Sequence, residues 1–66
     1  MRLVKLISYP AGEEYYLNPE VVEGVSAARE NEDTATNIFI HGDPEPYVVE
    51  GVLTTIVSNL TEGNYN

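Results

Sequence analysis

The chain has 66 residues, with 11 Asp and Glu against 3 Lys and Arg, and a formal net charge of −8 at pH 7. A chain of this length forms one domain and buries only about 60% of its unfolded surface, so its stability is marginal. The absence of cysteine excludes disulfides and thiolate-bound metals. A strongly acidic surface repels nucleic acid and anionic lipid and attracts basic proteins. We therefore expect a single domain, 1–66, whose partners are proteins.

The first residues predict no targeting segment. Their apolar run is interrupted by Lys5 and ends at Pro10, which is too short for a signal-peptide core or a membrane span. We expect a soluble, cytoplasmic protein that contacts neither membrane nor nucleic acid directly. Because so small a core is often completed by self-association through an apolar face, a homo-oligomer is a further expectation.

Hydrophobic alternation predicts strands in the first half of the chain. Residues 3–9 alternate and lead into the turn residues 10–12. A short aromatic strand at 14–17 ends at Asn18-Pro19, where proline cannot donate to a ladder. A third strand follows at 21–28, although Pro19 as a first helical residue leaves a short helix as the alternative. We prefer the strand.

The second half continues the strand pattern and then changes period. An acidic loop at 30–33 precedes a β-branched strand at 36–41, a turn with two prolines at 42–46 and a short strand from Tyr47 to Val49. Apolar residues then recur at helical spacing, with Gly63 as a C-terminal stop. These apolar positions are Val49, Val52, Leu53, Ile56, Val57 and Leu60.

The predicted fold class is therefore α+β, with a small antiparallel β-meander of four to five strands closed by one C-terminal amphipathic helix. We expect the helical side chains from Val52 to Leu60 to be buried against strand residues such as Leu6 and Ile38. The pentapeptide Val-Val-Glu-Gly-Val occurs at both 21–25 and 48–52. A repeat architecture needs about three units, so we interpret the two copies as coincidence. The alternative is that each copy marks a strand ending at its glycine.

Several short segments resemble the small flagellar FlbD or swarming-motility proteins. They are Tyr15-Tyr16-Leu17-Asn18-Pro19-Glu20, Asp33-Thr34, the β-branched strand to Gly42, and Tyr47-Val48-Val49-Glu50 before an aliphatic helix. The resemblance covers most of the chain. It implies a non-enzymatic accessory protein of the motility apparatus, with a four- or five-stranded sheet and a C-terminal helix.

No catalytic, cofactor or metal motif stands out in the sequence. His41, Asp43 and Glu45 alternate and could offer imidazole and carboxylate ligands. Pro44 and Pro46 restrict the backbone between them, so we interpret the segment as a polar hairpin loop. A chain this small also provides little concave volume for a substrate. We predict that the protein is not an enzyme and holds no cofactor or metal.

The acidic second half predicts a binding role instead, because no Lys or Arg follows Arg29. Small acidic phage-type inhibitors, whose carboxylates replace phosphates on a partner, have a similar composition. We predict a regulator or inhibitor of a basic partner protein, including a nucleic-acid-binding one, steered by acids and anchored by tyrosine. The predicted partner-binding residues are Glu30, Glu32, Asp33, Asp43, Glu45 and Tyr47. The alternatives are the motility accessory role and a structural subunit of a larger assembly.

The aromatic residues allow two interpretations. They could form a contact patch, since tyrosine is favoured at interfaces, or they could furnish the core of a domain without tryptophan. The residues concerned are Tyr9, Tyr15, Tyr16, Phe39 and Tyr47.

Overall fold

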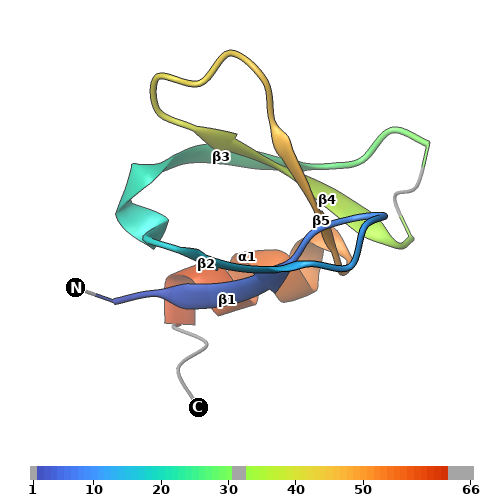
Figure 1. Ribbon diagram of the computed structural model, residues 1–66, viewed down its shortest axis with the longest axis horizontal. Coiled ribbons are helices and arrows are strands. Elements are labelled where there is room, and N and C mark those ends of the chain that lie inside the picture. The colour runs from blue at the N-terminus through green and yellow to red at the C-terminus, as the bar shows by residue number, and fades with distance from the viewer. Residues whose placement is uncertain (1, 31–32, 63–66) are drawn as a thin grey trace.

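The computed structural model describes residues 2–30 and 33–62. Over these residues the chain forms short strands followed by one α-helix (Figure 1). In chain order the elements are β1 (Val4–Ile7), β2 (Glu14–Leu17), the 3-10 helix η1 (Pro19–Val21), β3 (Val22–Ala27), β4 (Ala35–Ile40), β5 (Tyr47–Glu50) and α1 (Leu53–Glu62). The α+β class, the antiparallel strands and the C-terminal helix are confirmed.

The strands divide between two antiparallel sheets. β1 and β2 form a hairpin, and β3, β4 and β5 form a three-stranded meander. Figure 1 shows the hairpin at the bottom of the molecule and β3 and β4 across the top. An isolated bridge between Ser8 and Val49 joins the hairpin to β5, supported by the Tyr9 amide, which donates to the Val48 carbonyl at 2.9 Å. The predicted meander is thus interrupted between β2 and β3.

The interruption has a local cause at Asn18-Pro19. The Asn18 side chain accepts a hydrogen bond from the Glu20 amide at 3.0 Å, and Pro19 occupies the first turn of η1. These are the preferred N-cap and first-turn residues of a helix. The short-helix alternative is therefore correct for residues 19–21, whereas the preferred strand is correct from Val22.

The C-terminal helix begins later than its apolar pattern predicts. Val49 belongs to β5 and is only 1% exposed, so its inclusion in the helical pattern is wrong. Gly51 ends the strand with φ of 119°, a conformation that favours glycine. Its amide donates to the Thr34 carbonyl at 2.7 Å, and its carbonyl accepts from the Thr36 hydroxyl at 2.8 Å. The chain is thus held against β4 before α1 can begin at Leu53.

The core lies between the two sheets and α1. Its buried residues are Val4, Leu6, Ile38, Val49, Ile56 and Leu60. The expected burial is confirmed for Ile56 and Leu60 in α1, but it is wrong for Val57 in α1 and for Val52 just before it, which are 37% and 39% exposed, and Leu53 is only partly buried. Ile56 and Leu60 form a narrow stripe that packs against the sheets, and the other apolar residues of α1 are not buried with them.

Candidate functional site

The predicted acidic residues lie at two ends of the three-stranded sheet. Glu30 and Asp33 are exposed in the β3–β4 connection, whereas Asp43 and Glu45 lie in the β4–β5 connection (Figure 1, green and yellow to orange). β4, which separates the two connections, is a strand of 6 residues. At about 3.4 Å per residue, such a strand is roughly 17 Å long. Glu32 lies outside the described residues.

Asp43 and Glu45 are brought near Tyr47, and Asp43 also has a structural role. Its carboxylate accepts a hydrogen bond from the Glu45 amide at 3.2 Å, and its own amide donates to the Ile40 carbonyl at 3.0 Å. These contacts are typical of an aspartate that shapes a turn. Glu45 is exposed, so its carboxylate faces solvent beside the start of β5.

His41 pairs with β3 rather than with its neighbours in the loop. Its Nδ1 lies 2.6 Å from Oε2 of Glu23, and both side chains are largely exposed. Within the described ranges, no group of three or more His, Asp or Glu side chains is arranged to hold a metal ion. The His41–Glu23 pair therefore connects the residue that follows β4 to β3.

Tyr47 and Tyr15 form the most distinctive surface feature. Their rings stack with centroids 5.7 Å apart and an interplanar angle of 19°. Beneath and beside them lies a cleft of about 210 Å³ between the two sheets. We name it the tyrosine cleft; its lining consists of Leu6, Tyr15, Tyr16, Leu17, Ile38, Tyr47 and Val49.

Strand register explains how these side chains meet. Tyr15 lies opposite Leu6 in the hairpin, and Tyr47 lies opposite Ile38 in the meander. Directly paired residues place their side chains on the same face of a sheet. Because Leu6 and Ile38 both point into the core, both tyrosines are directed to the inner side, where the Ser8–Val49 bridge brings their strands together.

The tyrosine cleft combines an apolar floor with a phenolic rim. Leu6, Ile38 and Val49 are at most 4% exposed, whereas Tyr15 and Tyr47 are 42% and 40% exposed. Among the residues that the structure describes, no charged side chain lines the cleft. The cleft can receive an apolar side chain and present tyrosine hydroxyls around it.

The tyrosine cleft was not fully predicted from the sequence. Tyr47 was named as a partner-binding residue, whereas Tyr15 and Tyr16 were recognised only as members of an aromatic set. The signal that could have indicated them is the aromatic pair in a short strand with acidic residues before it. The sequence does not indicate the isolated bridge between Ser8 and Val49, which joins two distant parts of the chain.

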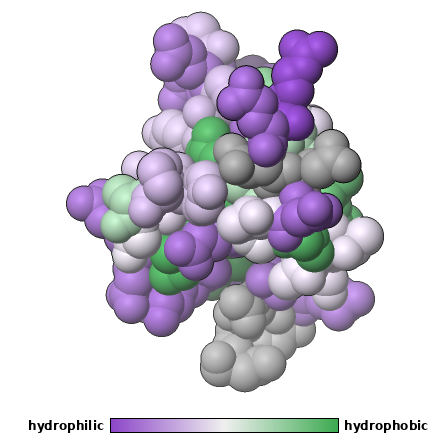
Figure 2. Space-filling view, turned by 90° about the vertical axis from the view of Figure 1, so that its right-hand side faces the viewer, coloured by the Kyte–Doolittle hydropathy of each residue, from purple (hydrophilic) through white to green (hydrophobic). Residues whose placement is uncertain are grey.

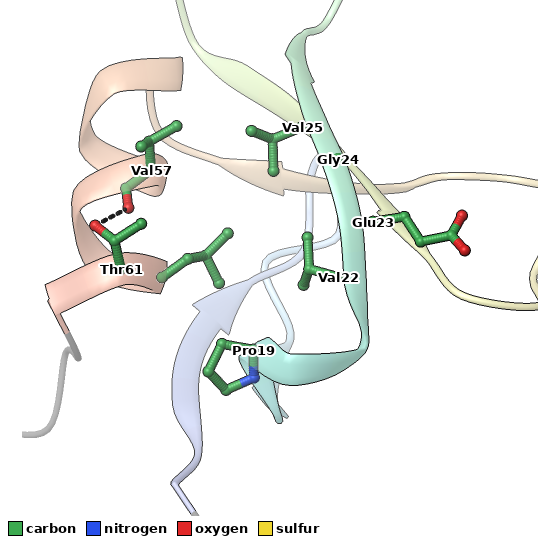
Figure 3. Close-up of a pocket in the computed structure, with 8 residues that line it drawn as sticks. Pro19, Val22, Glu23, Gly24, Val25, Val57 and Thr61 are labelled. Atoms are coloured by element: carbon green, nitrogen blue, oxygen red, sulfur yellow. Dashed lines mark hydrogen bonds between the residues drawn. The ribbon is translucent and has the colours of Figure 1, made fainter.

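A second hollow, of about 240 Å³, lies between α1 and β3 (Figure 3). Val22 and Val25 face Val57 across it, while the Glu23 side chain points away from the helix. Gly24 adds no side chain there, and a Cβ at this position would meet nothing within 4 Å. The Thr61 hydroxyl at its border donates to the Val57 carbonyl at 2.9 Å, so this polar group is engaged within α1.

Apolar residues on one face of the molecule are scattered (Figure 2). On the face shown in Figure 2, hydrophobic side chains form separate patches between polar ones rather than one continuous surface. Single exposed apolar residues are normal for soluble domains. The tyrosine cleft therefore differs from the rest of the described surface in joining a defined hollow to stacked aromatic rings.

Comparison with known proteins found no matching family model, and no significant match among curated proteins or solved structures. In the two described ranges, no helix has both the length and the apolar character needed to cross a membrane.

Proposed function

We propose that the chain is a non-enzymatic, acidic binding protein that regulates or inhibits a basic partner protein through the tyrosine cleft. The observation that carries this proposal is the stacked Tyr15–Tyr47 pair beside an apolar hollow. Tyrosine contributes large contact area at little entropic cost and is enriched where interfaces concentrate their binding energy. A partner side chain entering the cleft would bury its apolar surface against Leu6 and Ile38.

The charge distribution supports a basic partner. Of the strong bases, Arg2 donates to the Leu60 carbonyl at 2.6 Å, and Lys5 lies 3.2 Å from the Glu14 carboxylate. Glu13 and Glu14 precede Tyr15 in the chain, and Asp43 and Glu45 precede Tyr47. Complementary charge of this kind increases the rate of encounter and sets partner preference.

The positions of the acids favour steering over direct imitation of a nucleic-acid backbone. Imitation requires carboxylates in a row on one face, whereas Glu30 and Asp33 lie at the far end of β4 from Asp43 and Glu45. The distant pair can still contribute to the long-range field at low salt, because exposed charges are screened over about 8 Å at physiological ionic strength.

A second candidate is the motility accessory role implied by the FlbD resemblance. The order of short strands followed by one C-terminal helix agrees with what that resemblance implies. Fold-level similarity alone does not carry function. Finding the gene beside genes for flagellar assembly would favour this role over inhibition.

The proposed function is tested by isolating the partner from the native host and measuring its binding kinetics. Tyr47→Ala should accelerate dissociation by about tenfold or more, because it removes an anchor at the cleft. Phe39→Ala is the matched control, since Phe39 is also an aromatic residue, 36% exposed, but lies outside the cleft lining. Equal dissociation rates for the two variants would exclude the tyrosine cleft as the contact site.

A further inference from the structure

The outer edge of β2 is open in the described structure. β2 pairs with β1 on one side, and no strand within residues 2–30 and 33–62 pairs with its other side. Unpaired strand edges present main-chain donors and acceptors that can template an added strand. The edge is short, because η1 begins at Pro19 immediately after β2.

The hydrogen-bond alternation identifies which groups face outward. The Ser8 amide donates to the Glu13 carbonyl at 2.8 Å, which makes this the hydrogen-bonded position that begins the hairpin ladder. In an antiparallel ladder such positions alternate, so Tyr15 and Leu17 direct their main chain toward β1. The amide and carbonyl of Tyr16 therefore point to the open edge.

Tyr16 also borders the tyrosine cleft, although its side chain belongs to the opposite face from that of Tyr15. It lies opposite Lys5 in the ladder and is 61% exposed. Since alternate side chains of a strand point to opposite faces, the main chain of Tyr16 forms this part of the cleft rim. The open edge and the apolar hollow are thus parts of one surface.

We infer that a basic, extended segment of a partner protein adds to β2 as a further strand and places one aliphatic side chain in the tyrosine cleft. The residue opposite Tyr16 would exchange main-chain hydrogen bonds with it, as in other cases of strand addition. The next residue of the segment would point inward, because side chains alternate, and would reach the floor at Leu6 and Ile38. This inference rests on the proposed function and specifies how its partner is held.

The acidic charge of the chain favours a basic partner segment over a second copy of the chain at this edge. Glu13 immediately precedes the open strand, Glu14 at its start is paired with Lys5 at 3.2 Å, and each copy carries a net charge of −8. Two such edges would bring like charges together, whereas a segment with Lys or Arg beside its aliphatic residue is complementary to the edge.

The test uses end-blocked peptides Thr-Lys-Φ-Lys-Thr, where Φ is Ala, Val, Leu, Ile or Phe, titrated into the full chain and followed by amide NMR shifts. Shifts should be largest at Tyr16, Leu6 and Ile38, and Leu or Ile should bind about tenfold more tightly than Ala because of the buried aliphatic surface. The matched peptide with Glu in place of both Lys should not bind.

Methylating the amide nitrogens of both lysines removes the main-chain donors while the protein stays unaltered. Affinity should fall by about tenfold or more, as expected for lost main-chain hydrogen bonds. On the protein side, Tyr16→Pro removes the outward amide and should weaken binding in the same way.

Three outcomes would overturn strand addition. These are the absence of shifts at Tyr16 with every peptide, equal binding of methylated and unmethylated peptides, and a dimer in sedimentation that Tyr16→Pro dissociates. If the native partner nevertheless dissociates faster from Tyr47→Ala than from Phe39→Ala, the proposed function stands and only strand addition to β2 is withdrawn. If that difference in dissociation rate is also absent, strand addition and the proposed function are both withdrawn.

Discussion

Gly51 shows how one residue directs the path of the chain between the sheet and the helix. Its φ is 119°, and a Cβ at this position would lie 3.1 Å from Cδ1 of Ile56. Its amide and carbonyl are both engaged, with Thr34 and Thr36. Any other residue would have to adopt a strained backbone and displace a core side chain at the same time.

Gly51→Ala should therefore lower the free energy of unfolding by about 1–3 kcal/mol. The control is Gly24→Ala, which lies in the same pentapeptide sequence but has open space where the Cβ would be placed. We expect that variant to change stability by about 0.5 kcal/mol or less. Urea denaturation of both proteins measures the difference, and equal losses would contradict the assigned role of Gly51.

The two pentapeptides also show why identical sequence does not fix identical structure. Gly24 lies inside β3 next to a register shift between Val22 and Gly24, whereas Gly51 follows the end of β5. The idea that each copy ends a strand at its glycine is right only for 48–52. Tertiary pairing with β4 decides the outcome in each case, and the local sequence contains no information about that pairing.

At the scale of elements, α1 is attached through a narrow stripe. Ile56 is 2% exposed and belongs to the core cluster, whereas Val57, one position further on, is 37% exposed. Neighbouring helical residues point in directions about 100° apart, so Ile56 lies on the buried face of the helix and Val57 on a more exposed one. The contribution of each side chain to stability should follow this difference.

Ile56→Ala should cost on the order of 2–5 kcal/mol, because it leaves a cavity between α1 and the sheets. In a domain this small, that loss could abolish folding. Val57→Ala should change stability by about 0.5 kcal/mol or less, since alanine also has the higher helix propensity. Thermal melts followed by circular dichroism provide the measurement, and a large loss in the Val57 variant would mean that the helix packs through a different face.

Periodicity predicted most of these elements, for a physical reason. The alternation of residues 3–9 and the β-branched run at 36–41 reflect half-buried strands, and the spacing of Ile56 and Leu60 reflects a helix resting on a sheet. Val49 fits the helical spacing by position alone, because a buried strand residue just before a helix is also apolar. Only the hydrogen bonds of Gly51 reveal that the period changes there.

Sheet pairing and the site were less predictable, since both depend on contacts between distant segments. Nothing local to Glu14–Leu17 indicates that no strand of the described residues pairs with the second side of β2, and nothing local to Tyr47 indicates that it meets Tyr15. The bridge between Ser8 and Val49 is likewise a contact between distant segments. Glu30, Asp33 and Glu45 are exposed and Asp43 is half-buried, and their distribution over two ends of β4 required the fold.

At the scale of the whole molecule, the two acidic ends should contribute unequally to partner association. Asp43 and Glu45 lie close to the tyrosine cleft in the chain, whereas Glu30 and Asp33 lie at the other end of β4. Electrostatic attraction between exposed groups weakens strongly beyond the screening length of about 8 Å. Charges near the contact site therefore act on the encounter over a wider range of salt.

Reversing Asp43 and Glu45 to Lys should reduce the association rate of the native partner more than reversing Glu30 and Asp33, although both pairs change the net charge equally. The difference should shrink as salt rises. Surface-plasmon kinetics at low and physiological ionic strength would reveal it. Equal effects of the two reversals would show that only total charge matters, and insensitivity to both would leave solubility as the role of the acids.

The hydrogen bond from Arg2 to the Leu60 carbonyl also bears on how long the folded state lasts. It joins residues 58 positions apart, so it can form only after nearly the entire chain has been gathered. Such late contacts contribute little to the folding transition state and act mainly by slowing unfolding. Arg2→Met should therefore increase the unfolding rate in stopped-flow experiments while leaving the refolding rate almost unchanged. The contact would then determine how long the folded state lasts and not how fast it forms.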